Sequence, residues 1–284
     1  MGAVLAEPLT IRPMTVEDLD AATELSREQL WPHREEDWEL FLALGEGLAA
    51  ERDGRLIGTA MGWRFGEDMA TIGMVIVSPA AQGQGVGRKL MEAMIDRLGD
   101  RTILLNATEE GLPLYLKLGF VETGRIYQHQ GPAPDVPLPE LIPGERVRPK
   151  GRADGALGAL YSSATGMDRT ALFDALAANS RTVVLSRDQQ AVGFAMLRRF
   201  GRGWSIAPVV APDEAGAKTL ILHWLGMKKG RFCRIDITAD SGLGDWLEQL
   251  GLPRAGSVRI MARGPAPVAG SDATVFSIAA QALG

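Results

Sequence analysis

Two hydrophobic periods alternate along the first 130 residues of the chain. In some segments the apolar residues recur every three or four positions, which is the spacing of a helix with one buried face. The helices predicted in this way are 16–29, 37–44, 88–98 and about 112–118. Apolar stretches that alternate with polar residues, or that are rich in β-branched residues, predict strands. These strands are 48–52, 56–65, 71–77, 102–105 and one that begins at Phe120. The order of helices and strands predicts an α/β domain with a mixed sheet.

Turn and capping residues mark several boundaries of these elements. Thr15 precedes the first helix, whose first turn is acidic, as is typical of a capped N-terminus. Asp53-Gly54 lies between two predicted strands and indicates a tight hairpin. Pro79 ends the apolar stretch 71–77, which we interpret as a buried central strand.

Prolines gather after residue 130 and predict a linker. Each proline fixes one backbone torsion and removes an N–H donor, so a dense series sustains neither a helix nor a central strand. The series is Pro132, Pro134, Pro137, Pro139, Pro143 and Pro149. We therefore predict an N-terminal domain at 1–130, a linker at 131–144 and a second domain at 145–284, with a closing strand at 274–279.

An internal repeat relates the two predicted domains. Its ungapped part matches Arg52-Asp53, Gly58, Ala60-Met61 and Arg64-Phe65-Gly66 with Arg187-Asp188, Gly193, Ala195-Met196 and Arg199-Phe200-Gly201. Farther along, Val77-Ser78-Pro79 matches Val210-Ala211-Pro212, and Leu118-Gly119-Phe120 matches Leu250-Gly251-Leu252. Chance similarity between two hairpins is the alternative, but the shared order and near-constant offset favour two copies of one fold. We call 1–130 the first copy and 145–284 the second copy.

Composition and charge narrow the functional class. A length of 284 residues suits two domains, and the net charge of −5 argues against a broad nucleic-acid surface. Cys233 is the single cysteine, which excludes an intramolecular disulfide and a cysteine-rich metal site, and we expect no metal. Neither a membrane-spanning apolar run nor a signal-peptide pattern is present. We therefore expect a cytoplasmic protein that binds neither nucleic acid nor membrane.

A glycine-rich segment lies between the central strand and the helix that follows it. It has the sequence Gln82-Gly83-Gln84-Gly85-Val86-Gly87-Arg88-Lys89. Glycines at such a junction allow backbone N–H groups to converge, and the helix dipole adds positive potential, so the segment suits a diphosphate. A Walker loop would need Gly-Lys-Ser/Thr, and a dinucleotide fingerprint would need a different glycine spacing. A plain turn without a ligand is the remaining alternative.

These residues resemble a known family. Val77-Ser78-Pro79-x-x-Gln82-x-x-Gly85-x-Gly87-Arg88-x-Leu90 is similar to the acetyl-CoA signature of the GCN5-related N-acetyltransferases, and Leu114-Tyr115-x-x-Leu118-Gly119-Phe120 resembles the family's second hallmark. Further similarity, at 37–38, 72–75 and 107–115, is to a bacterial subgroup with a second, diverged domain of the same type. The resemblance implies α/β tandem domains, each with a mixed, largely antiparallel twisted sheet flanked by helices.

The resemblance also implies a cofactor, a reaction and a set of residues. The cofactor is acetyl-CoA, and the reaction is transfer of its acetyl group to a primary amine that attacks the thioester directly. A backbone N–H of the central strand would stabilise the oxyanion, the glycine-rich segment would hold the diphosphate, and Tyr115 would protonate the leaving thiolate. The implied cofactor-binding residues are Met74, Val75, Ile76, Val77, Gln82, Gly83, Gln84, Gly85, Val86, Gly87, Arg88 and Thr108. For Tyr115 a packing role is the alternative, and for Thr108 a helix cap.

The acceptor is expected to be a small molecule or a peptide with a primary amine. Trp31, His33 and Asp37 are candidates to bind it, with helix packing as the alternative for the aromatic residues. Because an amine of ordinary pKa is almost fully protonated at neutral pH, a base must remove its proton. The candidates are Glu67, Asp68, Glu109, Glu110 and His33, and their spacing singles out none.

The second copy lacks both chemical features of the first. Pro212-Asp213-Glu214-Ala215-Gly216 replaces the glycine-rich segment and is acidic, and Leu247 stands at the position of Tyr115. We therefore expect an inactive copy that walls the acceptor site, binds a regulator or mediates pairing into a homodimer. The alternative functions are a non-catalytic acetyl-CoA sensor or scaffold and a transferase of another acyl group.

Overall fold

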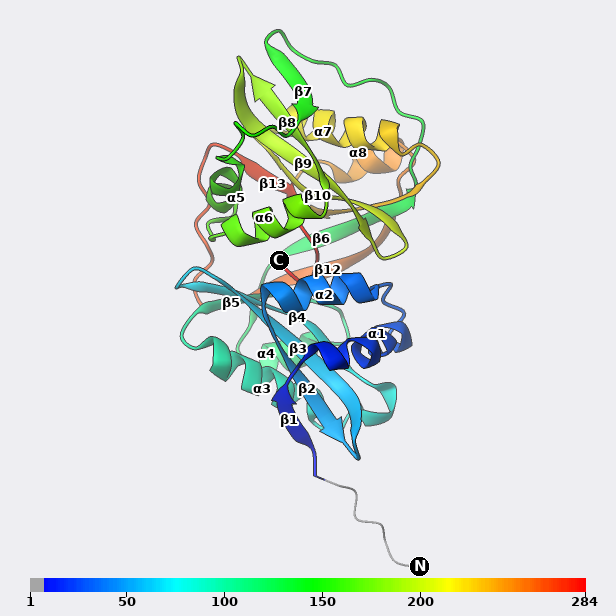
Figure 1. Ribbon diagram of the computed structural model, residues 1–284, viewed down its shortest axis with the longest axis vertical. Coiled ribbons are helices and arrows are strands. Elements are labelled where there is room, and N and C mark those ends of the chain that lie inside the picture. The colour runs from blue at the N-terminus through cyan, green and yellow to red at the C-terminus, as the bar shows by residue number, and fades with distance from the viewer. Residues whose placement is uncertain (1–7) are drawn as a thin grey trace, which may run out of the picture. The chain divides into compact units, whose positions relative to one another are not determined.

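The computed structural model describes residues 8–284. Contacts within the chain divide it into a first unit that ends at Ile103 and a second unit, Leu104–Gly284. Each unit has a sheet with helices packed on it (Figure 1). The boundary lies within strand β5, Thr102–Ala107.

The sheet of the first unit is antiparallel and runs in the order β1, β2, β3, β4. Its strands are β1 (Thr10–Pro13), β2 (Glu46–Arg52), β3 (Arg55–Phe65) and β4 (Met69–Val77), and its helices are the 3-10 turns η1 (Val16–Asp18) and η2 (Pro79–Ala81) with α1 (Leu19–Glu28), α2 (Glu35–Leu44) and α3 (Val86–Leu98). Alternate residues of β3 face opposite sides of the sheet, one side being covered by α3 and the other by α2. A Cβ atom on Gly62 would lie 2.6 Å from Met94 Sδ of α3, whereas the Trp63 indole N–H donates to the Phe41 carbonyl of α2 at 2.9 Å.

The predicted helices and strands of the first copy are confirmed, with small shifts at their ends. The first helix starts as a 3-10 turn in which Thr15 and Asp18 form a capping box. The hairpin turn has positive φ at Asp53 (52°) and Gly54 (69°), as the sequence predicts. Strand β1 is the omission, because an edge strand of 4 residues has too little hydrophobic pattern to be recognised.

In the second unit the strand order is β12, β6, β11, β13, β10, β9, β8, β7. These strands are β6 (Val121–Pro132), β7 (Glu145–Pro149), β8 (Arg181–Arg187), β9 (Gln190–Phe200), β10 (Gly203–Ala211), β11 (Phe232–Thr238), β12 (Arg254–Arg263) and β13 (Thr274–Ser277), and the helices are α4 (Leu112–Lys117), α5 (Leu157–Thr165), α6 (Thr170–Ala178), α7 (Glu214–Met227) and α8 (Gly244–Gln249). By sequence β6 belongs to the first copy, yet it pairs with β11 and β12 of the second. The boundary between the two copies in the sequence therefore differs from the boundary between the two units that the contacts define.

The predicted closing strand is β13, and it separates two strands of the second copy. At one end β10 pairs with β11 directly, through Trp204 with Cys233. At the other end β13 lies between them, pairing Ser277 with Val209 of β10 and with Ile237 of β11. The C-terminal strand thus fills the space where β10 and β11 diverge.

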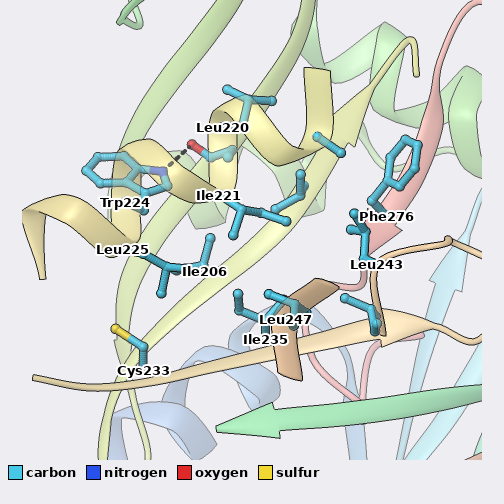
Figure 2. Packing of buried hydrophobic residues seen from close by; sticks show 14 of the residues in the cluster. Ile206, Leu220, Ile221, Trp224, Leu225, Cys233, Ile235, Leu243, Leu247 and Phe276 are labelled. Atoms are coloured by element: carbon cyan, nitrogen blue, oxygen red, sulfur yellow. Dashed lines mark hydrogen bonds between the residues drawn. The ribbon is translucent and has the colours of Figure 1, made fainter. Parts of the chain in front are cut away.

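The core of the second unit lies between the sheet and α7 (Figure 2). Leu220, Ile221 and Leu225 of α7 are fully buried against strand residues such as Ile206 and Ile235. On the same helix the Trp224 indole N–H donates to the Ala195 carbonyl at 3.2 Å. The neighbouring residue on β9, Phe194, faces the other layer, where its ring meets that of Phe173 of α6 at 5.1 Å between centroids.

The repeat extends to ion pairs that the sequence comparison did not include. Arg12 forms two hydrogen bonds of 2.8 Å with the Asp18 carboxylate, and Arg148 forms two of 2.7 Å with Asp154. In each pair the arginine holds the pKa of the carboxyl below its usual value. Both carboxylates also accept a backbone N–H three residues earlier. No helix within residues 8–284 is long and apolar enough to span a bilayer.

Candidate functional site

The glycine-rich segment of the first unit links the end of β4 to the start of α3. Gly83 and Gly85 have φ of 74° and 78°, a region that residues with a side chain rarely adopt. A Cβ atom at either position would meet no atom within 4 Å. Backbone conformation rather than crowding therefore requires these glycines, and the surface of the loop is open.

The N-terminus of α3 carries no anion of its own among the residues that the structure describes. Its N-cap is Gly85, which has no side chain to accept the free N–H groups, and its first turn has no acidic residue. Gly87 lies within this first turn, and Arg88 pairs with Glu92 one turn later at 2.7 Å. Converging free N–H groups and the helix dipole make this end of α3 suited to an external anion.

Arg52, at the end of β2, lies beside the loop and was missed by the sequence analysis. Its Nη1 donates to Gln84 Oε1 at 2.7 Å, and Gln84 in turn donates to the Ala80 carbonyl at 3.0 Å. Within residues 8–284 no carboxylate pairs with Arg52. A half-buried guanidinium held by a neutral amide adds positive charge to the open loop.

In the second copy, the counterparts of the α3 N-terminus and of Arg52 bind a carboxylate of the protein itself. Asp213 is the N-cap of α7, and its Oδ1 accepts the Gly216 N–H at 2.7 Å. Arg187, which aligns with Arg52, donates to both oxygens of Asp213 at 2.8 and 3.2 Å and holds the pKa of that carboxyl below its usual value. Here the protein's own carboxylate occupies the helix N-terminus and the arginine, whereas Gly85 leaves both without an anion from residues 8–284.

Strand β4 is interrupted by a bulge at the predicted cofactor-binding residues. Between the pairs Met61–Gly73 and Thr59–Ile76 the register shifts, so that Met74 and Val75 lie opposite a single residue of β3. Met74 has a positive φ of 50°. Its carbonyl accepts the Thr59 hydroxyl at 2.8 Å, which holds the bulge in place. A bulge releases backbone groups from the ladder, so β4 can offer an N–H donor to a ligand.

Tyr115 belongs to the second unit and is buried in α4. The ring packs edge-on against Phe120, with 6.2 Å between centroids, and burial raises the pKa of Tyr115 to about 12. A Cβ atom on Gly111 would lie 2.8 Å from the ring and 3.2 Å from the hydroxyl oxygen. The backbone of α4 thus fixes the ring closely.

Thr108 lies in the turn before α4, and the N-cap of that helix is Gly111. Its hydroxyl accepts the Gly111 N–H at 3.4 Å, which is a long hydrogen bond, and its carbonyl accepts the Leu112 N–H at 3.0 Å. Its contribution to cofactor binding stays a prediction. The corresponding helix of the second copy, α8, has the fully buried Leu247 and therefore no hydroxyl.

The three predicted acceptor-binding residues lie at the start of α2. The Trp31 and His33 rings meet edge-on at 5.9 Å, and His33 meets Phe41 at the same distance. Asp37 is buried, accepts the Arg34 N–H at 3.0 Å and pairs with the Arg34 guanidinium at 2.8 Å. These contacts give Asp37 a capping role, and its contact with an acceptor stays a prediction.

The candidate bases differ in their surroundings. Glu109 pairs with Arg259 at 3.0 Å, which occupies its carboxylate oxygens. Glu67, Asp68 and Glu110 are exposed, and His33 is half-buried. Among residues 8–284, no three His, Cys, Asp or Glu side chains gather in a way that would hold a metal ion.

Comparison with known proteins identifies two related domains. Residues 13–120 match the model of the acetyltransferase (GNAT) family, and residues 159–277 match that of an acetyltransferase (GNAT) domain. The chain is 28% identical over 261 residues to the uncharacterized N-acetyltransferase YitH of Bacillus subtilis, covering 89% of this chain and 91% of that protein.

Two solved structures share the fold. One is a putative acetyltransferase from Pyrococcus horikoshii, with a TM-score of 0.80, 20% identity and coverage of 100% of this chain and 99% of that one. The other is a tandem GNAT protein from the clavulanic acid biosynthesis pathway, with a TM-score of 0.67, 14% identity and coverage of 91% and 100%. At these identities the likeness concerns the fold, and it agrees with two copies in one chain.

Proposed function

Because the chain belongs to the acetyltransferase (GNAT) family and is an N-acetyltransferase with two such domains, we propose that its first copy transfers an acetyl group from acetyl-CoA to a primary amine of a small molecule or peptide. The observation that carries this proposal is the anion-free N-terminus of α3 beside Arg52, set against the filled N-terminus of α7.

The residues of the loop fit the diphosphate of coenzyme A. Gly83 and Gly85 keep the loop surface free of side chains, and no side chain among residues 8–284 caps the first N–H groups of α3. Two phosphate charges would be met by these N–H groups and by the Arg52 guanidinium. The Asp213–Arg187 pair of the second copy supports this assignment, since the same elements bind a carboxylate there.

Bound acetyl-CoA would supply the acyl group as an activated thioester. In our proposal the bulge at Met74 and Val75 turns a backbone N–H toward the acyl carbonyl oxygen, where a fixed donor acts at low reorganisation cost. Burial raises the pKa of Tyr115 to about 12, so its hydroxyl would keep a proton that it could donate to the departing sulfur of a bound cofactor. Thr108 stays a candidate for cofactor contact, in addition to its hydrogen bond within the turn before α4.

The acceptor is proposed to bind near Trp31 and His33, whose rings are in contact. The indole would pack against an apolar part of the acceptor, and the imidazole is a hydrogen-bonding group beside it. Asp37 would act through the position of Arg34 and the start of α2. The second copy is proposed to be inactive in acetyl transfer, because Asp213 occupies its anion site and Leu247 replaces the tyrosine.

The proposal is tested by following released thiol from the purified full chain with acetyl-CoA and a panel of polyamines, amino acids, aminoglycosides and peptides. We expect turnover with at least one class of primary amine, and binding of coenzyme A by calorimetry. Binding without turnover across the panel would favour the sensor alternative, and turnover only with a longer acyl-CoA would favour transfer of another acyl group. Absence of coenzyme A binding would contradict both the proposal and the sensor.

Arg52→Gln is expected to raise the KM for acetyl-CoA about ten-fold with little change in kcat. The reason is that a charge-assisted hydrogen bond to phosphate contributes roughly 1.5–3 kcal/mol in both ground and transition states. Arg55→Gln is the matched control, because Arg55 lies across the same hairpin turn, is exposed, and has no ion pair among the described residues. An equal rise in KM for both variants would remove Arg52 from the phosphate site.

Gly111→Ala is expected to lower kcat about ten-fold or more, because a Cβ atom would force the Tyr115 ring to move and 1 Å of displacement is costly in catalysis. The φ of Gly111 is −79°, so the backbone itself tolerates alanine. Steady-state kinetics together with the thermal midpoint separate this effect from unfolding. Gly244→Ala at the start of α8 is the control, since nothing lies within 4 Å of its Cβ position.

A further inference from the structure

The second unit contains a pocket of about 800 Å³ that the proposed reaction does not use. It lies where the end of β7, the start of β8 and the C-terminal end of α7 meet. Its lining residues are Pro149, Lys150, Gly151, Arg152, Ala177, Ser180, Arg181, Thr182, Val183, His223, Trp224 and Met227. Asp213 caps the opposite end of α7, so this pocket is distinct from the counterpart of the phosphate loop.

Positive charge dominates the lining. Lys150, Arg152 and Arg181 are exposed cations, and no carboxylate belongs to the lining. None of the three forms an ion pair within residues 8–284, in contrast to Arg148 and Arg187 on the same strands. In a chain with a net charge of −5, three such cations around one cavity form a localised anion-attracting site.

A further cation, Lys228, stands close to Arg181. The pKa of Lys228 is lowered by burial first and then by the charge of Arg181, with Arg199 and Arg231 acting in the same direction. The Lys228 ammonium lies 3.5 Å from the centre of the Trp204 ring, which balances part of its charge. Cations crowded in this way repel one another, and an anion in the pocket would relieve the repulsion.

Two hydroxyl groups of the lining have no hydrogen-bond partner within the described part of the chain. Ser180 Oγ and Thr182 Oγ1 are both shielded from solvent. A buried hydroxyl without a partner costs free energy, so the wall of the cavity holds two unsatisfied donors. Direct contact with a bound phosphate falls to the exposed guanidinium forks, which match phosphate oxygens in geometry.

The remaining wall is apolar. Trp224, Met227 and Val183 line it, and burial lowers the pKa of the half-buried His223, which favours the neutral form of this ring. A cavity of this volume with an apolar wall and one charged end suits a drug-sized molecule with a non-polar part. Inorganic phosphate alone would leave most of the volume empty.

We propose that this pocket, which we call the basic pocket, binds a phosphorylated small molecule of nucleotide size, with its phosphate on Lys150, Arg152 and Arg181. The inference goes beyond the proposed reaction and gives the inactive copy a ligand-binding role. It depends on neither Tyr115 nor the glycine loop, so it stands even if acetyl transfer is disproved.

The test uses inorganic pyrophosphate as the probe, titrated by calorimetry into the full chain carrying Gly85→Asp, which gives α3 the carboxylate that Asp213 gives α7 and so closes the first copy's loop to anions. We expect one pyrophosphate site per chain in this variant. Arg152→Gln, on an exposed turn, should lower the affinity about ten-fold, and Arg152→Gln with Arg181→Gln about 100-fold, since each charge-assisted contact is worth about a factor of ten.

Arg263→Gln is the matched control, because it removes one exposed arginine that does not line the pocket. Its affinity for pyrophosphate should equal that of the wild type, and thermal midpoints establish that all variants are folded. Unchanged affinity in the folded Arg152→Gln variant, or no pyrophosphate site left once Gly85→Asp closes the first copy's loop, would overturn the proposal. Tight binding of citrate without binding of pyrophosphate would also overturn it, since the ligand would then be a carboxylate.

Discussion

Replacing Tyr115 by phenylalanine is expected to lower kcat about 100-fold or more while leaving the KM for acetyl-CoA unchanged, because a proton donor acts only as the bond to sulfur breaks. The substitution keeps the ring, its contact with Phe120 and the packing around Gly111. Steady-state kinetics with the acceptor identified in the amine panel measures both constants.

The expected pH dependence of kcat follows from the direction in which burial shifts the pKa of Tyr115. Burial raises the pKa of Tyr115 to about 12, so the hydroxyl keeps its proton through pH 10 and is lost as a donor only above that range. The wild-type kcat should therefore not fall between pH 8 and pH 10, where a tyrosine of ordinary pKa, about 10, would begin to deprotonate. A fall in that interval that disappears in Tyr115→Phe would show that burial does not protect the proton.

Tyr127→Phe provides the control for the tyrosine substitution. Tyr127 is another tyrosine of the second unit, on β6, where its ring stacks under Arg254. Its hydroxyl has no role in the proposed reaction, and the variant should retain full kcat. If Tyr115→Phe retained full activity as well, the tyrosine would be a packing residue and the acid would have to be found elsewhere.

Local features of the fold were predictable because local chemistry determines them. The Asp53-Gly54 turn requires positive φ at two adjacent positions, and the spacing of Leu90, Met91 and Met94 selects the buried face of α3. The pairing of β6 with β11 and the position of β13 were not predictable, since a strand's pattern gives its buried face but not its neighbour.

The sequence predicted those parts of the candidate site that belong to a local motif, namely the glycine-rich segment and the tyrosine of α4. Arg52 escaped because its partner Gln84 lies 32 residues away, although the repeat contained the signal: Arg52 aligns with Arg187, and Gly85 replaces Asp213 as the N-cap. The basic pocket was not predicted for a similar reason: residues 150–152 and Arg181 are distant in sequence and come together only in the folded chain. Asp37 shows the reverse case: the sequence made it a candidate to bind the acceptor, whereas in the fold its carboxylate accepts the Arg34 N–H and pairs with the Arg34 guanidinium at the start of α2.

Gly85→Asp is expected to raise the KM for acetyl-CoA about 100-fold, because it gives α3 the carboxylate that Asp213 gives α7. Like charges about 4 Å apart repel by roughly 4 kcal/mol at the effective dielectric constant of a protein surface, and salt reduces this to about 2–3 kcal/mol. Aspartate tolerates the left-handed φ of 78° better than most residues, so the fold should persist. Calorimetric titration with coenzyme A measures the loss of affinity independently of turnover.

Gly85→Asn separates charge from shape, because asparagine has nearly the size of aspartate and accepts the same backbone conformation. It should raise the KM by about ten-fold or less, the remaining difference from Gly85→Asp being the electrostatic part. That difference should shrink as the salt concentration rises, since the carboxylate and the phosphates are near the surface. Equal losses in the two variants at low salt would mean that bulk alone disturbs the loop, and that the N-terminus of α3 does not hold the negative charge of the cofactor.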